Sequence, residues 1–115
     1  MEQVLTYCMQ VAPLQMRVGE WTGCAVMVAE GTGLGYWWSE EAERFVLAHL
    51  ASGASLHVWA GTMAAAQKGI EGIMGLADWT LSKEQLFQAY DEESLHDRVN
   101  AVVDALIAEG HDLER

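Results

Sequence analysis

The chain contains 115 residues, of which 51% are hydrophobic and 20% are charged, and it has one proline. This composition excludes an intrinsically disordered chain, and the length suits a single folded domain spanning residues 1–115. The formal net charge of −11 repels phosphate groups and therefore argues against direct nucleic-acid binding.

The N-terminal third predicts an antiparallel sheet. Apolar and polar residues alternate with period two in residues 5–11 and again in residues 14–18, as in strands with one better-buried face. Residues 24–29 are a continuous apolar run, which favours an interior strand, and residues 36–38 predict a short edge strand. The glycine-rich residues 31–35 mark a turn, and consecutive strands joined by short turns favour antiparallel pairing.

Residues 39–53 predict the first helix. Ser39 is a good N-cap, the two glutamates after it suit the positive end of the helix dipole, and Gly53 suits a left-handed C-cap. One apolar stripe with helical spacing is formed by Ala42, Phe45, Val46, His49 and Leu50. Residues 56–60 then predict another strand.

Residues 62–77 keep helical spacing but contain Gly69, Gly72 and Gly75. Each glycine costs about 1 kcal/mol relative to alanine inside a helix. Either the helix packs tightly against a neighbour on its glycine side, or the segment is a loop with one helical turn. We expect a short, imperfect helix.

The C-terminal segment predicts two helices. Ser82 and Gln85 form a capping box, and Leu81 and Leu86 occupy the positions of a hydrophobic staple. On a helical wheel, the apolar face jumps by about half a turn between Tyr90 and the apolar residues from 95 to 107. One straight helix with one buried side cannot do this. We therefore predict a break at residues 91–93 and a second helix that ends near Gly110.

Known signatures of catalysis are missing from the sequence. The glycine cluster lacks the Lys-Ser/Thr pair of a P-loop and the third glycine of the dinucleotide motif. The four histidines and two cysteines lack the spacing of metal ligands, and no nucleophile elbow is present. His49 is expected to be a hydrogen-bonded histidine at the edge of the core. We predict no enzymatic activity, no cofactor and no metal.

Two features favour protein binding. Trp37 and Trp38 are adjacent, so a strand points them to opposite faces, and an exposed aromatic residue is typical of binding hot spots. The last 34 residues hold nine acidic and three basic residues, a net charge of −6. Opposite the apolar face of the last helix, the wheel predicts a polar stripe of Glu93, Asp97, Asn100 and Asp104. Such a stripe is either a solvated face or a contact for a basic partner.

The chain begins without the basic region of a secretory signal. Its most apolar stretch, residues 21–38, contains Glu30 and four glycines, so it does not predict a membrane span. We expect a cytoplasmic protein in which Cys8 and Cys24 are reduced, and a disulfide between them is the alternative.

The expected fold is α+β, with an antiparallel sheet of three to five strands, helices packed on one side and a long C-terminal helix. The expected function is that of a non-enzymatic acidic binding module or inhibitor that docks on a basic surface of a partner protein through Glu93, Asp97, Asp104, Trp37 and Trp38. A phage-type inhibitor of a restriction or CRISPR complex fits this description, as does an antitoxin or immunity protein. The rival is a small-molecule-binding domain or small enzyme with a pocket lined by Trp37, Trp38, Trp59 and His57. We also expect a two-fold homodimer.

Overall fold

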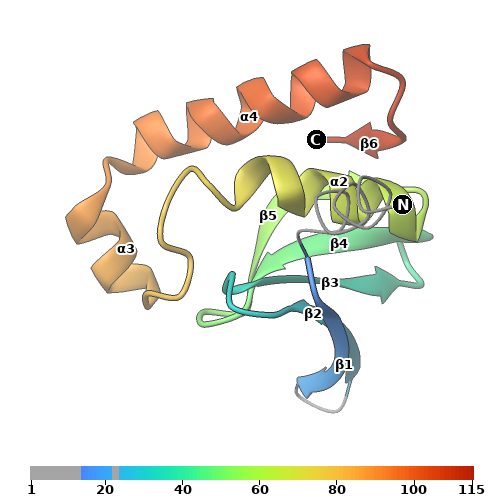
Figure 1. Ribbon diagram of the computed structural model, residues 1–115, viewed down its shortest axis with the longest axis horizontal. Coiled ribbons are helices and arrows are strands. Elements are labelled where there is room, and N and C mark those ends of the chain that lie inside the picture. The colour runs from blue at the N-terminus through green and yellow to red at the C-terminus, as the bar shows by residue number, and fades with distance from the viewer. Residues whose placement is uncertain (1–13, 22–23) are drawn as a thin grey trace, which may run out of the picture.

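The computed structural model describes residues 14–21 and 24–115 (Figure 1). Within these ranges, six strands form one antiparallel sheet in chain order, and three helices pack with it. The strands are β1 (Met16–Trp21), β2 (Cys24–Ala29), β3 (Leu34–Ser39), β4 (Arg44–His49), β5 (Ala54–Ala60) and β6 (Leu113–Glu114). The helices are α2 (Met63–Ile73), α3 (Lys83–Ala89) and α4 (Glu92–Ala108). The α+β class and the long C-terminal helix are confirmed, and the sheet is larger than the three to five strands expected.

Helices α2 and α4 form two layers over the sheet. Helix α2 packs on β4 and β5, α4 packs on α2, and the short β6 returns beside α4 to pair with β5 (Figure 1). The main core lies between α2 and the sheet face that carries Tyr36 and Leu47, both of which are fully buried. Trp37 and Val46 alternate to the opposite face of the same strands. The predicted strand at residues 5–11, and with it the state of Cys8, lies outside the described residues.

The predicted helix at residues 39–53 is wrong, because this segment contains β4 and the turns on either side of it. Ser39 does accept a hydrogen bond from the backbone of Ala42 (3.1 Å), but the bond closes the β3–β4 turn. Gly53 does have a positive φ of 75°, but it lies in the β4–β5 turn. Residues 46–49 are all buried. A strand buried on both faces produces a continuous apolar run, which also satisfies helical spacing.

The expected edge strand at residues 36–38 is part of an interior strand. Strand β3 spans Leu34–Ser39 and pairs with β2 on one side and β4 on the other. Because residues 44–49 form a strand and not a helix, β3 has a hydrogen-bonded neighbour on each side. At the other end of the sheet, β1 begins near the predicted strand 14–18 and continues to Trp21.

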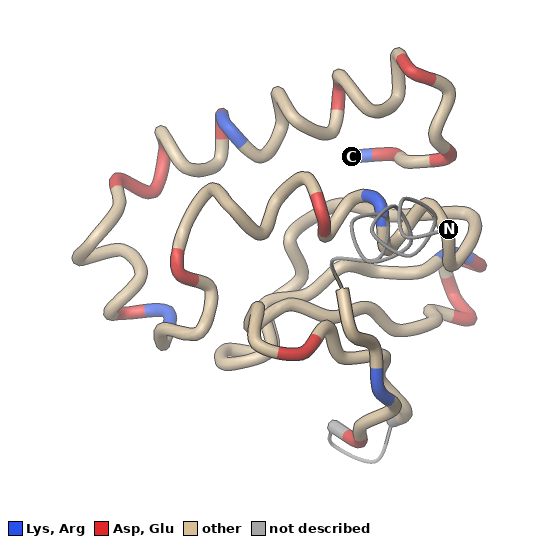
Figure 2. Tube along the Cα trace, viewed as in Figure 1, with Lys and Arg blue, Asp and Glu red and all other residues tan. Residues whose placement is uncertain are grey.

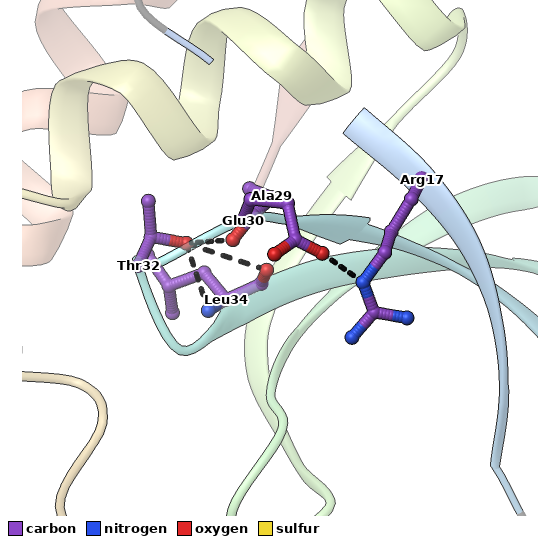
Figure 3. A network of polar contacts seen from close by, with 5 residues as sticks. All are labelled: Arg17, Ala29, Glu30, Thr32 and Leu34. Carbon is purple, nitrogen blue, oxygen red and sulfur yellow. Dashed lines mark hydrogen bonds and ion pairs between the residues drawn. The ribbon is translucent and has the colours of Figure 1, made fainter. Parts of the chain in front are cut away.

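The β2–β3 turn is held by side chains on both of its flanks (Figure 3). The Thr32 hydroxyl donates to the Ala29 carbonyl (2.8 Å) and accepts from the Leu34 N–H (3.1 Å). Arg17 on β1 forms an ion pair with Glu30 at the end of β2. The glycine cluster is therefore a β-hairpin turn, as expected.

Helix α2 confirms the predicted imperfect helix and explains two of its glycines. A Cβ atom added to Gly69 would lie 3.0 Å from Leu47 of the sheet, and one added to Gly72 would lie 2.8 Å from Val102 of α4. The two glycines thus allow the helix to approach a neighbour on each side. Their loss of helix propensity is offset by the closeness of the packing.

The predicted break between the last two helices is confirmed. Helix α3 ends at Ala89, Tyr90 is extended with φ −132° and ψ 141°, and α4 begins at Glu92 after the N-cap Asp91. The Asp91 carboxylate accepts from the Ser94 N–H at 2.9 Å.

Among the helices of the described residues, none is long and apolar enough to cross a membrane.

The capping box is also confirmed, and it supports a stability prediction. The Ser82 hydroxyl accepts from the Gln85 N–H and the Gln85 side chain accepts from the Ser82 N–H, both at 3.2 Å. Ser82→Ala should lower the free energy of unfolding by about 1 kcal/mol, and Leu81→Ala should also destabilise the domain because Leu81 packs against the core.

Urea unfolding of each variant measures these losses. The control is Ser94→Ala, since Ser94 is an exposed residue of α4 whose hydroxyl makes no hydrogen bond within the described residues. This control should stay within about 0.5 kcal/mol of the wild type. Equal stability of the wild type, Leu81→Ala and Ser82→Ala would contradict the role of the cap and staple.

Candidate functional site: a cleft beside the α3–α4 junction

A cleft of about 790 Å³ lies between the β4–β5 hairpin and the α3–α4 junction. Its residues come from three separate parts of the chain, which are β4–β5, the loop before α3, and the two last helices. Apolar lining residues are Leu56, Trp79, Leu86, Phe87, Leu95 and Val99, and charged or titratable ones are His49, His57, Lys83, Asp91, Glu92, Glu93 and His96. The cleft volume falls within the usual range of ligand sites, about 300–1,000 Å³.

The break between α3 and α4 builds the apolar part of this cleft. Leu86 and Phe87 project from α3, while Leu95 and Val99 project from α4, so two helix faces line the same space. Leu86 is the one buried residue of α3, and Phe87 is half-buried. The half-turn jump of the apolar face therefore reflects the two helix faces that line the cleft. From the sequence, however, this jump predicted only the break between the helices and not the cleft.

His57 lines the cleft from an irregular part of β5. Three residues of β5, at positions 56–58, lie opposite the single residue Leu47 of β4, which makes a β-bulge. His57 has a positive φ of 59°, and this conformation costs roughly 1–2 kcal/mol in a residue with a side chain. Its N–H donates to the Ser55 hydroxyl at 2.9 Å. Bulges often re-aim a side chain beside a functional site.

His49 has a structural role at the bottom of the cleft. It is 3% exposed, its Nε2–H donates to the Leu81 carbonyl (2.9 Å), and its Nδ1 lies 2.7 Å from the Ser52 hydroxyl. The expected hydrogen-bonded histidine is confirmed, although it lies on a strand. The bond to Leu81 ties β4 to the segment just before α3, and the bond to Ser52 lies within the β4–β5 hairpin. Both ring nitrogens are therefore occupied.

The acidic stripe lies on the exposed side of α4, and its members have different surroundings. Glu93 and Asp97 are exposed and share a shallow depression with Ser94 and Arg98. Farther along the helix, Asp104 is held by Arg115, whose guanidinium donates to both carboxylate oxygens, at 2.7 and 3.0 Å. These hydrogen bonds lower the pKa of Asp104. Asp104 thus has a partner within the chain, whereas Glu93 and Asp97 have none in the described ranges.

The described surface is predominantly negative. Every described Asp and Glu except Glu71 is exposed. Four of the six basic residues pair with carboxylates inside the chain, namely Arg17, Arg44, Lys68 and Arg115. Acidic residues line the start of α4 and recur along it (Figure 2). The α3–α4 junction is the point where this surface meets the cleft, since Asp91, Glu92 and Glu93 line the cleft.

The tryptophans predicted as contacts lie on the sheet. Trp38 is 46% exposed and packs edge-on against Phe45, with ring centroids 4.9 Å apart. Trp37 is half-buried on the opposite face, in one cross-strand row with Val46 and Trp59. The two faces are therefore as expected, but the structure places neither residue beside Glu93 and Asp97. The two-fold dimer stays a prediction.

The cleft differs from the tryptophan-lined pocket of the rival hypothesis. His57 lines it, but the tryptophan that contributes is Trp79, not Trp37, Trp38 or Trp59. Sequence reasoning missed Trp79 and His96, because neither belongs to a motif.

No group of three or more potential metal ligands occurs in the part of the chain that the structure describes. Comparisons with protein-family models, with curated proteins and with solved structures found no match.

Proposed function

We propose that this chain is a non-enzymatic acidic binding module that docks on a basic surface of a partner protein. The observation that supports the proposal is the concentration of exposed carboxylates at the start of α4, including Glu92, Glu93 and Asp97, which form no ion pair with another described residue. Complementary charge steers the encounter of two proteins and fixes their orientation.

An inhibitor is the form of this function that the charge favours most. Carboxylates along one helix imitate a row of phosphates, so they suit a groove that normally binds nucleic acid. A phage-type inhibitor of a restriction or CRISPR complex would work in this way, and an antitoxin or immunity protein is the other form. The small-molecule-binding alternative has less support, because three of its four proposed lining residues lie outside the cleft.

In the proposed contact, the three carboxylates of the stripe have unequal weight. Glu93 and Asp97 are its centre, and Asp104 contributes less because Arg115 already neutralises it. Replacing all three with lysine would also break the Asp104–Arg115 pair, which makes a loss of binding harder to interpret. The double variant Glu93→Lys/Asp97→Lys leaves that pair intact.

The test is capture of partners from a host lysate at low and high salt, followed by affinity measurement with the partner that mass spectrometry identifies. Glu93→Lys/Asp97→Lys should weaken binding ten-fold or more, since attraction becomes repulsion, and high salt should weaken wild-type binding. The control Glu40→Lys/Glu41→Lys makes the same change in charge at the exposed β3–β4 turn and should have a smaller effect. Wild-type affinity in both double variants, shown by circular dichroism to be folded, would refute the proposal.

A further inference from the structure

We infer that the cleft beside the α3–α4 junction receives a bulky apolar side chain, carried by a basic segment of the partner. This inference rests on the proposed function, since it names what the partner presents to the acidic surface. The occupant is a peptide segment with an aromatic or large aliphatic residue between lysines or arginines.

The apolar lining is the first argument. Helix α3 is seven residues long and buries only Leu86, so Phe87 keeps part of its ring accessible within the cleft. Leu56 from β5 and Val99 from α4 continue the apolar surface on either side. An aromatic side chain that fills such a space removes a large apolar area from water, as anchor residues do at the centre of an interface.

The charge of the rim is the second argument. The side of the cleft formed by α4 carries three acidic residues, Asp91, Glu92 and Glu93. Apart from histidines, Lys83 is the one basic residue among the described lining residues. Asp91 is engaged as the N-cap of α4, which leaves Glu92 and Glu93 as exposed acceptors. A lysine or arginine beside the anchor residue would lie within reach of these carboxylates, whereas an acidic segment would be repelled.

The third argument is the rigidity of the cleft wall opposite α4, which is formed by the β4–β5 hairpin and Trp79. The hydrogen bond from His49 of β4 to the Leu81 carbonyl fixes the β4–β5 hairpin to the segment just before α3, and the bond between His49 and Ser52 holds the hairpin turn itself. Trp79 is buried and its indole N–H is bonded to Ile73. A wall held in this way is already in place before the partner arrives, which lowers the entropic penalty of binding.

Three synthetic peptides test the inference by NMR titration of the isotope-labelled 115-residue chain. They are Lys-Lys-Ser-Phe-Ser-Lys-Lys, the same peptide with alanine in place of phenylalanine, and the phenylalanine peptide with glutamate in place of lysine. The basic phenylalanine peptide should shift the indole N–H resonance of Trp79 and bind at least ten-fold more tightly than each of the other two.

Filling the cleft provides the matched variants. Ala54 is exposed and lines the cleft, so Ala54→Phe should reduce binding of the basic phenylalanine peptide to the level of the alanine peptide. Ala64 is an exposed alanine of α2 that does not line the cleft, so Ala64→Phe should leave binding unchanged. His96→Trp, on the exposed rim, is a second filling variant if Ala54→Phe melts below the wild type.

The outcomes separate this inference from the proposed function. Equal binding of the two basic peptides, weakened by Glu93→Lys/Asp97→Lys but not by either filling variant, would overturn the anchor and leave the acidic docking surface standing. If the phenylalanine peptide with glutamates binds as tightly as the phenylalanine peptide with lysines, the claim that the occupant is basic would be overturned. That result would also remove the charge argument for the proposed function. Failure of all three peptides to bind would overturn the anchor, while the lysate experiment would still decide the function.

Discussion

Gly33→Ala should lower the free energy of unfolding by about 3 kcal/mol, one of the largest losses expected from a single methyl group in this chain. Gly33 lies in the β2–β3 turn with φ +79°. A Cβ atom there would lie 2.3 Å from the carbonyl oxygen of Trp79. The obstacle is backbone, so the loop before α3 would have to move away from the sheet.

Gly31→Ala is the matched control. Gly31 belongs to the same turn and has a similar φ of +76°, but a Cβ atom there meets nothing within 4 Å. Its substitution should therefore cost only the strain of the left-handed conformation, about 1–2 kcal/mol. Urea unfolding of both variants measures the difference, which isolates the contact with Trp79. Equal losses would show that the β2–β3 turn and the loop before α3 are not in close contact at Gly33.

Local signals in the sequence were enough for the features that depend on neighbouring residues. The capping box of Ser82 and Gln85 and the break after Tyr90 are both present, because caps and helix faces are set within a few residues. The interior strand at residues 24–29 has the predicted bounds. Each of these segments has one local conformation that its own sequence favours.

The segment around β4 could not be predicted in this way, since its conformation depends on distant partners. Trp38 lies opposite Phe45 and Tyr36 lies opposite Leu47, and the rings of Tyr36 and Trp38 both contact Phe45 edge-on. Cross-strand aromatic contacts of this kind stabilise a hairpin by roughly 0.2–1 kcal/mol each. They outweigh a helix signal that consists of one cap residue and an ambiguous apolar run.

The candidate site was predicted only in part, for the same physical reason. The helical wheel placed Glu93, Asp97 and Asp104 on the exposed side of α4, because the wheel is a local property. The pairing of Asp104 with Arg115 depends on the return of the chain through β6, which no local pattern indicates. The cleft likewise combines β5 with two helices about thirty residues later, so its lining could be known only from the fold.

Trp79 in the loop before α3 contacts both α2 and β4, and Trp79→Ala should destabilise the domain by about 3–5 kcal/mol. Its side chain is 3% exposed and packs edge-on against His49, with ring centroids 6.1 Å apart. Its indole N–H donates to the Ile73 carbonyl at 3.0 Å, which satisfies one of the last carbonyls of α2. Alanine would leave a cavity and remove this hydrogen bond, although the Ile73 carbonyl would still accept from the Leu76 N–H at 3.0 Å. Trp79→Phe would keep most of the packing and lose only the hydrogen bond.

Trp38→Ala is the control for the loss of an indole ring. Trp38 is 46% exposed, and its main described contact is the edge-on packing with Phe45. Its removal should cost less than half of the Trp79→Ala loss, because much of its surface is already in water. Trp79→Phe should also cost less than Trp79→Ala, with a loss of about 0.5–1.5 kcal/mol from the missing hydrogen bond. Calorimetric melts of the three variants measure the order, and a Trp38→Ala loss as large as that of Trp79→Ala would contradict the central position assigned to Trp79.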